Sequence, residues 1–161
     1  MEILNKNHLR DQFDCGEESL TRYLKLFAMR KMLNICYVHA KEDLQVKAYY
    51  TLSNYSLIKN EIKPDTFPFK MVFDHIPTTL LGKFAVDKTM QNQGLGQWML
   101  LDALSQSYKI AMFSASTAVV VEALNEAAAT YYQRFGFKLL HDNKYFIPMK
   151  SIEKLLNDQP N

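Results

Sequence analysis

Leu80–Leu104, LLGKFAVDKTMQNQGLGQWMLLDAL, carries the strongest structural signal in this sequence. Leu80–Asp87 is rich in branched and aromatic residues and predicts a buried strand, and a polar loop then leads without proline into a helix. Gly94 and Gly96 stand just before that helix, where glycine lets the backbone approach a ligand closely. The first amides of a helix have no partner within it, so this junction predicts a phosphate-binding turn. The alternative is that the glycines only make a tight strand-to-helix turn.

The composition indicates one globular domain. With 161 residues, 48% of them hydrophobic and 22% charged, the chain is long enough to bury a core without disulfides or metal. We therefore expect a single domain over residues 1–161. No membrane-spanning segment and no apolar signal-peptide run are present, so we expect a cytoplasmic protein with no membrane partner. The formal net charge of +2 is too small to demand a nucleic-acid partner.

The cysteine and histidine residues give no sign of a metal site. Cys15 and Cys36 are the only cysteines of the sequence, and they lack the CxxC spacing of redox or zinc sites. We expect reduced thiols packed as small apolar groups. The histidines are scattered and form no HExxH pair. No metal ligand is therefore predicted.

The N-terminal half predicts a short strand, an amphipathic helix and a hairpin. Asp14 and Glu17 are spaced as in a capping box, and apolar residues follow at helical spacing from Leu20 to Ala28. Turn-forming residues separate two β-prone runs, which favours a hairpin. The expected strands are Met1–Lys6, Ile35–Ala40 and Val46–Leu52, with Asn54–Leu57 extending the last.

The polar side of this helix and its continuation are basic. A solvated face is the simpler interpretation, and a small basic patch is the alternative. A patch would favour a polyanionic partner. The residues concerned are Arg22, Lys25, Arg30 and Lys31.

The segment Lys59–Ile76 is expected to be a long irregular connection, because it contains Pro64 and Pro68. Its aromatic residues either pack back on the body of the protein or line the substrate side of a pocket. The first alternative is favoured. These residues are Phe67, Phe69 and Phe73.

The C-terminal half predicts a helix with clear ends between short strands. Asn125 is placed as the N-cap of a helix that opens with Glu126, and Gly136 is expected to end that helix in the left-handed conformation. On the helix after the glycine loop, Gln97, Asp102 and Gln106 are expected to face away from the core. The other expected elements are strands at Thr117–Leu124, Phe137–Leu140 and Tyr145–Ile147 and a helix at Ser151–Leu156. Together these elements predict an α/β or α+β sheet domain.

The glycine loop resembles the acyl-CoA pyrophosphate loop of the GNAT acetyltransferases. The family pattern is Gln/Arg-x-x-Gly-x-Gly/Ala after a central strand, and this chain matches it at Gln91, Gly94 and Gly96. A third glycine, as in dinucleotide folds, and the Gly-Lys-Ser/Thr of a P-loop are both absent from the loop. The resemblance implies acetyl-CoA as cosubstrate and the GNAT fold, a single mixed, mostly antiparallel central sheet flanked by helices. The cofactor-binding residues that it implies are Phe84, Ala85, Val86, Gln91, Asn92, Gln93, Gly94, Leu95, Gly96 and Gln97.

A second segment, Ala129–Phe137, resembles the GNAT ending in which a helix tyrosine lies at the acyl-CoA thiol. The residue that corresponds to this tyrosine is Tyr132. Asn125 matches the position that often touches the pantetheine arm of the cofactor. Two motifs in the right order, each in the expected strand-then-helix context, are more specific than either alone.

A narrower resemblance is to the acetyltransferase toxins of bacterial toxin–antitoxin pairs. It is carried by Phe13–Gly16, Tyr37–Val38, Ala48–Leu52 and Phe84–Asp87. Those toxins acetylate the amino group of aminoacyl-tRNA and so stop translation. The resemblance implies aminoacyl-tRNA as acceptor, a ribbon-helix-helix antitoxin as partner and a homodimer. Leu81–Phe84 departs from the toxins' usual Arg-containing approach to the central strand, which counts against the tRNA acceptor but not against acetyl-CoA.

Two other functions stay open at this point. One is a GNAT enzyme acting on a small amine, an antibiotic or a protein N-terminus. The other is an acyl-CoA-binding regulatory protein without catalysis, against which the retained Tyr132 speaks.

The resemblance implies direct acetyl transfer with little covalent machinery. The phenol of Tyr132, with a reference pKa of about 10, is protonated at neutral pH and can donate to the leaving thiolate. The alternative is a core tyrosine, because it shares a helical stripe with Ala128 and Phe135. An α-amino acceptor, with a reference pKa of about 7.7, needs no dedicated base. A lysine or polyamine acceptor would need one, and Glu122 is a weak candidate, better explained as a charged residue near a strand end.

Overall fold

The chain forms one mixed sheet and four α-helices within the residues that the computed structural model describes, 1–30, 32–67 and 70–158. The strands are β1 (Glu2–Ile3), β2 (Ile35–Ala40), β3 (Val46–Ile58), β4 (His75–Val86), β5 (Ala118–Glu122), β6 (Lys138–His141) and β7 (Lys144–Pro148). The helices are α1 (Glu18–Leu26), α2 (Leu95–Ala111), α3 (Glu126–Arg134) and α4 (Met149–Asn157), with short 3-10 turns η1 (Lys59–Glu61) and η2 (Lys88–Met90).

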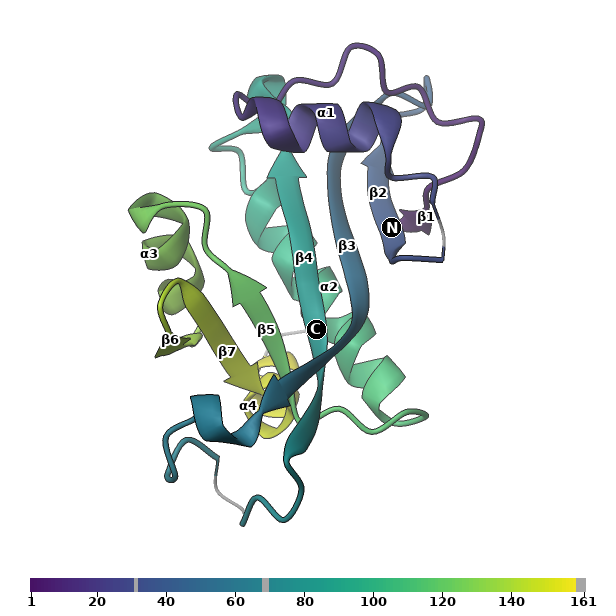
Figure 1. Ribbon diagram of the computed structural model, residues 1–161. Coiled ribbons are helices and arrows are strands. Elements are labelled where there is room, and N and C mark those ends of the chain that lie inside the picture. Colours follow the sequence, from purple (N-terminus) through teal and green to yellow (C-terminus); the bar gives the residue numbers. More distant parts are fainter. Residues whose placement is uncertain (31, 68–69, 159–161) are drawn as a thin grey trace. The chain divides into compact units, whose positions relative to one another are not determined.

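The seven strands lie in the order β1-β2-β3-β4-β5-β7-β6 (Figure 1). β4 and β5 pair in parallel, whereas the pairs β1–β2, β2–β3, β5–β7 and β6–β7 are antiparallel. This is the predicted mixed, mostly antiparallel sheet, and its strands alternate with helices along the sequence.

Two compact units divide the chain. The first comprises Met1–Ser53 and Gly82–Ala103, and the second comprises Asn54–Leu81 and Leu104–Asn161. β3, β4 and α2 each begin in one unit and end in the other. Each unit has a hydrophobic core of its own.

In the first unit, α1 packs on the sheet through the buried Leu24. Ala28, which lies two residues after the end of the helix, is also buried. They meet Val38 of β2 and Tyr49 of β3 in one cluster, and the Tyr49 hydroxyl donates to the carbonyl of Leu20 at 2.7 Å. The predicted hairpin is confirmed, with Ile35 opposite Leu52 in the antiparallel register.

The expected capping box of α1 is wrong. The helix begins at Glu18, and Glu17 is its N-cap, with a side-chain oxygen that accepts from the Ser19 N–H at 3.4 Å. Asp14 lies outside the helix because its carboxylate is engaged elsewhere, by the Gly16 N–H and by Lys88.

The expectation that Asp102 faces away from the core is also wrong. The side chain is half-buried, and its carboxylate accepts a hydrogen bond from the hydroxyl of the buried Tyr50 on β3. Tyr50 in turn stacks on Tyr37 of β2 with ring centroids 5.0 Å apart. Gln97 is exposed as expected.

In the second unit, β4 begins at His75, earlier than the expected start at Leu80. Pro77 lies within the strand, and its carbonyl accepts from the N–H of Thr117 at 2.9 Å and from the Thr117 hydroxyl at 3.0 Å. Thr79–Leu81 then pair with Val119–Val121 of β5.

The connection before β4 contributes one aromatic residue to the second core. Phe67 is buried against Phe146 of β7, with ring centroids 5.3 Å apart. Phe73 is 75% exposed, so the expectation that these aromatics pack on the body holds for Phe67 but not for Phe73. Phe69 lies outside the described residues.

The remaining predicted elements are confirmed with small shifts of their ends. Asn125 caps α3, and Gly136 ends it with φ +88°. The last hairpin turns at Asp142, a non-glycine residue with φ +48°. In the part of the chain that the structure describes, no helix is long and apolar enough to cross a bilayer.

Candidate active site

The loop between β4 and α2 has the backbone shape of an anion-binding turn. Asn92 and Gly94 both have positive φ, +58° and +83°, which turn the chain toward the helix. The Trp98 N–H donates to the Gly94 carbonyl at 3.1 Å and begins the helical ladder, so the amides of Leu95–Gln97 come before it and have no partner within the helix. A Cβ at Gly94 would meet no atom within 4 Å, so the space beside the loop is open. These features fit a pyrophosphate group.

The side chains of Gln91 and Gln93 brace this loop from within. The Gln91 amide nitrogen donates to the carbonyls of Val86 and Cys15, both at 2.9 Å. The Gln93 amide nitrogen donates to the Thr89 carbonyl at 2.9 Å. The glutamine of the motif therefore sets the shape of the loop and ties it to the segment before α1.

Asp87, the residue after β4, is a buried carboxylate that the sequence analysis did not single out. It is only 3% exposed. One carboxylate oxygen accepts from the Thr89 N–H at 3.0 Å and from the Thr89 hydroxyl, and the other accepts from the Asp14 N–H at 3.1 Å. Lys47 Nζ lies 3.8 Å away. Burial alone would raise the pKa of Asp87, but these hydrogen bonds and Lys47 together hold it below the ordinary value for aspartate.

Residues 14–16 lie against the same loop. The Lys88 N–H donates to the Asp14 carbonyl at 2.8 Å, and Lys88 Nζ is 2.9 Å from the Asp14 carboxylate. Gly16 has φ +89°, and a Cβ there would lie 3.2 Å from Lys88 Cε. The hydrogen bond from Lys88 is the main cause that lowers the pKa of Asp14. The resemblance of Phe13–Gly16 to the toxins is the sequence signal for this contact.

The other predicted cofactor-binding residues of the first unit, Phe84–Val86, are the last three residues of β4. Ala85 is buried and belongs to the first core, while Phe84 and Val86 are half-buried. Strand alternation puts the side chains of Phe84 and Val86 on the same face. The predicted cofactor residues Phe84–Val86 and Gln91–Gln97 therefore form one continuous strand-to-helix segment of the first unit.

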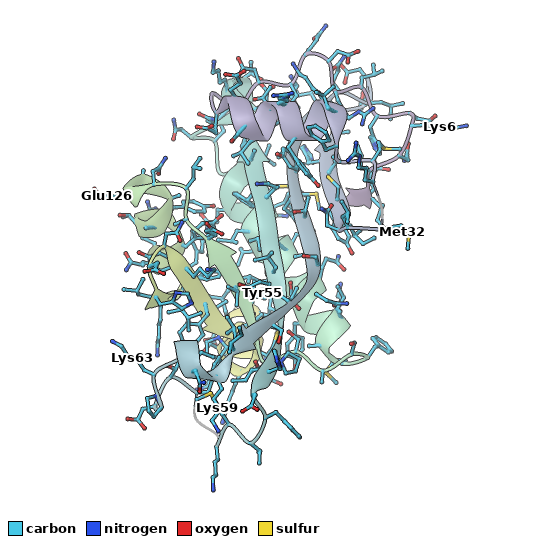
Figure 2. The ribbon with its side chains drawn as sticks, viewed as in Figure 1. Lys6, Met32, Tyr55, Lys59, Lys63 and Glu126 are labelled. Atoms are coloured by element: carbon cyan, nitrogen blue, oxygen red, sulfur yellow. The ribbon has the colours of Figure 1, made fainter. Side chains whose placement is uncertain are left out.

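Asn125 and Tyr132 belong to the second unit, at the start and in the last turns of α3. The Asn125 side-chain oxygen accepts from the Ala128 N–H at 2.9 Å, which satisfies one of the free amides at the helix start. Glu126, the first residue of α3, is exposed and is labelled at the start of the helix in Figure 2. The exposed Asn125 keeps its side-chain NH₂ for another partner, because its oxygen serves as the cap.

Tyr132 is buried in an aromatic cluster. It is 8% exposed, with ring centroids 5.7 Å from Tyr131 and 5.4 Å from Phe137. Burial raises the pKa of the Tyr132 hydroxyl well above its ordinary value, and burial likewise raises the pKa of Tyr131 to about 12. Both phenols are therefore protonated at neutral pH, which a hydrogen-bond donor requires.

The surroundings of Glu122 and Cys36 suit structural roles. The exposed Glu122 carboxylate accepts from the Asn143 amide at 3.2 Å, which suits a charged residue at a strand end. Cys36 is a buried thiol of the first core, and burial raises its pKa to about 12. Residues 1–30, 32–67 and 70–158 contain no group of three or more His, Cys, Asp or Glu side chains that could hold a metal ion.

Comparisons with known proteins agree with this geometry. Residues 65–139 match the acetyltransferase (GNAT) domain family. The chain is 31% identical over 130 residues to a tRNA-acetylating toxin of Mycobacterium tuberculosis, an alignment that covers 79% of this chain and 76% of the relative.

Two solved structures are similar over nearly the whole chain. The toxin AtaT in complex with acetyl-methionyl-tRNAfMet is 30% identical, with a TM-score of 0.84 over 96% of this chain and 97% of that one. A tyrosine-to-phenylalanine mutant of AtaT, bound to the C-terminus of the antitoxin AtaR and to acetyl-CoA, is 30% identical with a TM-score of 0.80 over 98% and 97%. This chain therefore belongs to the GNAT family and is an acetyl-CoA-dependent N-acetyltransferase.

Proposed function

We propose that this enzyme acetylates the amino group of aminoacyl-tRNA and acts as the translation-blocking toxin of a toxin–antitoxin pair. The observation that carries the proposal is the similarity, over 96% of the chain, to a toxin that was solved with its acetylated aminoacyl-tRNA. The similarity to a curated tRNA-acetylating toxin supports the same acceptor.

The cosubstrate is held by the strand-to-helix segment of the first unit. The amides of Gly94–Gln97 donate to the pyrophosphate of acetyl-CoA, and the backbone of Phe84–Val86 lies along the pantetheine arm as an added strand would. An amide of that strand stabilises the charge that develops on the acetyl oxygen. Gln91–Gln93 hold the loop in shape, and the side-chain NH₂ of Asn125 contacts the arm.

Tyr132 supplies the proton for the leaving group. The neutral acceptor amine attacks the thioester carbonyl carbon and forms the carbon–nitrogen bond. As the carbon–sulfur bond breaks, the Tyr132 hydroxyl, whose pKa is raised by burial, protonates the leaving sulfur, and the proton released from the amine nitrogen restores the phenol through solvent. The acceptor amine needs no dedicated base, because an α-amino group is already partly neutral at neutral pH. The cosubstrate contributes the activated thioester, and the chain contributes orientation, amide donors and one proton.

The assembly follows from the same proposal. The partners are acetyl-CoA, aminoacyl-tRNA and an antitoxin of the ribbon-helix-helix type, because the similar toxin AtaT was solved with the C-terminus of its antitoxin AtaR. Under this proposal the chain works as one catalytic domain over residues 1–161 and acts in the cytoplasm, where its acceptor is made, and the resemblance to the toxins implies a homodimer.

A second candidate acceptor is a small amine, an antibiotic or a protein N-terminus. It is favoured by Leu81–Phe84, which lacks the arginine of the toxins' usual pattern, and by the low net charge of +2.

The basic residues considered for a patch bear on the choice between the acceptors, because a patch would favour a polyanion such as tRNA. On α1 and the turn after it, Arg22 and Arg30 are exposed, and the Arg30 guanidinium lies 5.1 Å from the centroid of the Phe27 ring. Lys31, the other residue considered for a basic patch, lies outside the described residues.

The test is transfer of labelled acetyl from acetyl-CoA to a bulk pool of charged tRNA, beside a panel of free amines and peptides. Wild type and Tyr132→Phe are compared. We expect label on aminoacyl-tRNA with wild type and loss of that label in the variant. Label only on a small amine or peptide would discard the tRNA acceptor and leave the acetyltransferase chemistry in place.

A further inference from the structure

The hydrogen bonds around Asp87 have no role in the mechanism described above. They are confined to the first unit and join two segments far apart in sequence, residues 14–16 and residues 86–91. We propose that Asp87 is a positioning residue that holds the pyrophosphate loop in its binding shape by anchoring it to residues 14–16. This inference rests on the proposed assignment of the loop to acetyl-CoA.

The carboxylate of Asp87 fixes the first turn after β4. Its Oδ1 atom accepts from both the backbone and the side chain of Thr89, which makes Asp87 the N-cap of η2. The Asp87 N–H donates to the Lys47 carbonyl on β3 at 2.8 Å, so the residue is held from its backbone as well. The direction in which the chain leaves the sheet is therefore set at Asp87.

The other oxygen of the same carboxylate reaches the segment before α1. Oδ2 accepts from the Asp14 N–H at 3.1 Å, and the Lys88 N–H returns a hydrogen bond to the Asp14 carbonyl at 2.8 Å. Further along the loop, Gln91 donates to the Cys15 carbonyl at 2.9 Å. Together with the bond from Lys88 Nζ to the Asp14 carboxylate, four hydrogen bonds link residues 14–15 to both ends of the stretch 87–91.

This arrangement restrains the part of the chain that leads directly to the phosphate-binding amides. Gly94–Gln97 follow Gln91 after only two residues, Asn92 and Gln93, and Asn92 already has positive φ. A loop with several allowed shapes would lose conformational entropy on binding, whereas a pre-formed loop does not. Asp87 does not touch the reacting atoms in this scheme, so its effect falls on cosubstrate affinity and not on the chemical step.

The experiment measures the Kd of CoA by calorimetry, and kcat with saturating acetyl-CoA, for wild type, Asp87→Asn and Asp87→Ala. The asparagine variant keeps one acceptor oxygen and the shape of the side chain. The matched control is Asp102→Asn, which alters a half-buried carboxylate of the same unit that accepts a hydrogen bond from the Tyr50 hydroxyl. Thermal unfolding of each variant is recorded in parallel.

We expect Asp87→Ala to raise the Kd of CoA about tenfold or more, the effect of losing hydrogen bonds to a charged group. We expect a smaller rise for Asp87→Asn, none for Asp102→Asn, and kcat within about twofold of wild type in all three. S-acetyl-pantetheine, which lacks the pyrophosphate, should be used equally well by wild type and by the Asp87 variants.

An unchanged Kd in a folded Asp87 variant would overturn the inference. So would an equal loss with acetyl-CoA and with S-acetyl-pantetheine, because that pattern indicates general damage to the fold. If Asp87→Ala does not fold, Asp87→Asn decides by the same two criteria. The Kd of CoA is measured without an acceptor. Absence of acetyl transfer to tRNA would therefore overturn the proposed acceptor alone. Wild-type protein that does not bind CoA would overturn both the proposed function and the role of Asp87.

Discussion

Under the proposed function, the two units prepare for catalysis by different means. In the first unit the phosphate loop is held by polar contacts between segments distant in sequence, such as the Asp14 N–H with Asp87 and the Gln91 amide with the Cys15 carbonyl. In the second unit Tyr132 is held by packing within one helix and its end, against Tyr131 and Phe137. Under the proposed function, the anion site consists of donors fixed by tertiary hydrogen bonds, whereas the proton donor is held in position by aromatic packing.

The largest effect is expected from Gly94→Asp in the phosphate loop. The change puts a negative charge beside the pyrophosphate and a side chain at φ +83°, so we expect the Kd of CoA to rise about a hundredfold or more. Calorimetry with CoA measures this directly. Gly94→Ala is the control, because a Cβ meets no atom within 4 Å there and only the backbone strain remains. Unaltered affinity in Gly94→Asp would remove the loop from the cofactor site.

Tyr132→Phe should give the opposite pattern in the second unit. The phenyl ring keeps the packing against Tyr131 and Phe137, while the proton donor is lost. We expect kcat to fall about a hundredfold, with the Kd of CoA unchanged, because the hydroxyl acts only in the transition state. Steady-state transfer assays and calorimetry separate the two quantities. Tyr131→Phe is the matched control on the neighbouring phenol, and turnover that survives in Tyr132→Phe would leave Tyr132 a core residue.

Asn125 separates a structural role from a binding role. Asn125→Ala removes the cap of α3 and should lower the free energy of unfolding by about 1 kcal/mol. Asn125→Asp keeps the capping oxygen but loses the NH₂ group, so we expect its stability to be near wild type and its KM for acetyl-CoA to rise by about threefold to tenfold. Urea unfolding and steady-state kinetics test the pair. A normal KM in Asn125→Asp would restrict the residue to capping.

The contrast between the units also explains which features could be predicted from the sequence. Asn125 and Gly136 predict the two ends of α3 from residues that are close in sequence, and both predictions are confirmed. Asp14 was misplaced as a helix cap because its partners, Lys88 and Asp87, lie more than seventy residues away. Asp102 was misjudged for a similar reason, since its partner Tyr50 is on a strand of another part of the sequence.

The predictions made from prolines and from the glycine motif are limited in the same way, because they too ignore contacts between residues distant in sequence. Pro64 and Pro68 predicted an irregular connection up to Ile76, but β4 begins at His75 and includes Pro77, because a strand tolerates a proline where no N–H is needed. The glycine motif predicted a turn between a strand and a helix, which the structure has, yet it carries no information on Asp87, which contacts that loop through tertiary hydrogen bonds.

The smallest effect is a dependence of stability on pH that arises in the first unit. Hydrogen bonds and Lys47 hold the pKa of Asp87 below its ordinary value, despite burial, and the pKa of Asp14 is lowered by Lys88. In the unfolded chain these carboxyls take up protons near pH 4, before they do so in the folded chain. Their contribution to stability is therefore complete above about pH 5 and is lost as the pH falls through the lower, folded pKa values. In urea unfolding, the stability difference between wild type and Asp87→Asn should be constant from about pH 7 to pH 5 and should shrink below about pH 4. A difference that stays constant into acid would mean that the negative charge of the Asp87 carboxylate does not stabilise the folded state. The hydrogen bonds of the neutral Gln91 side chain would then be the ones that anchor the loop.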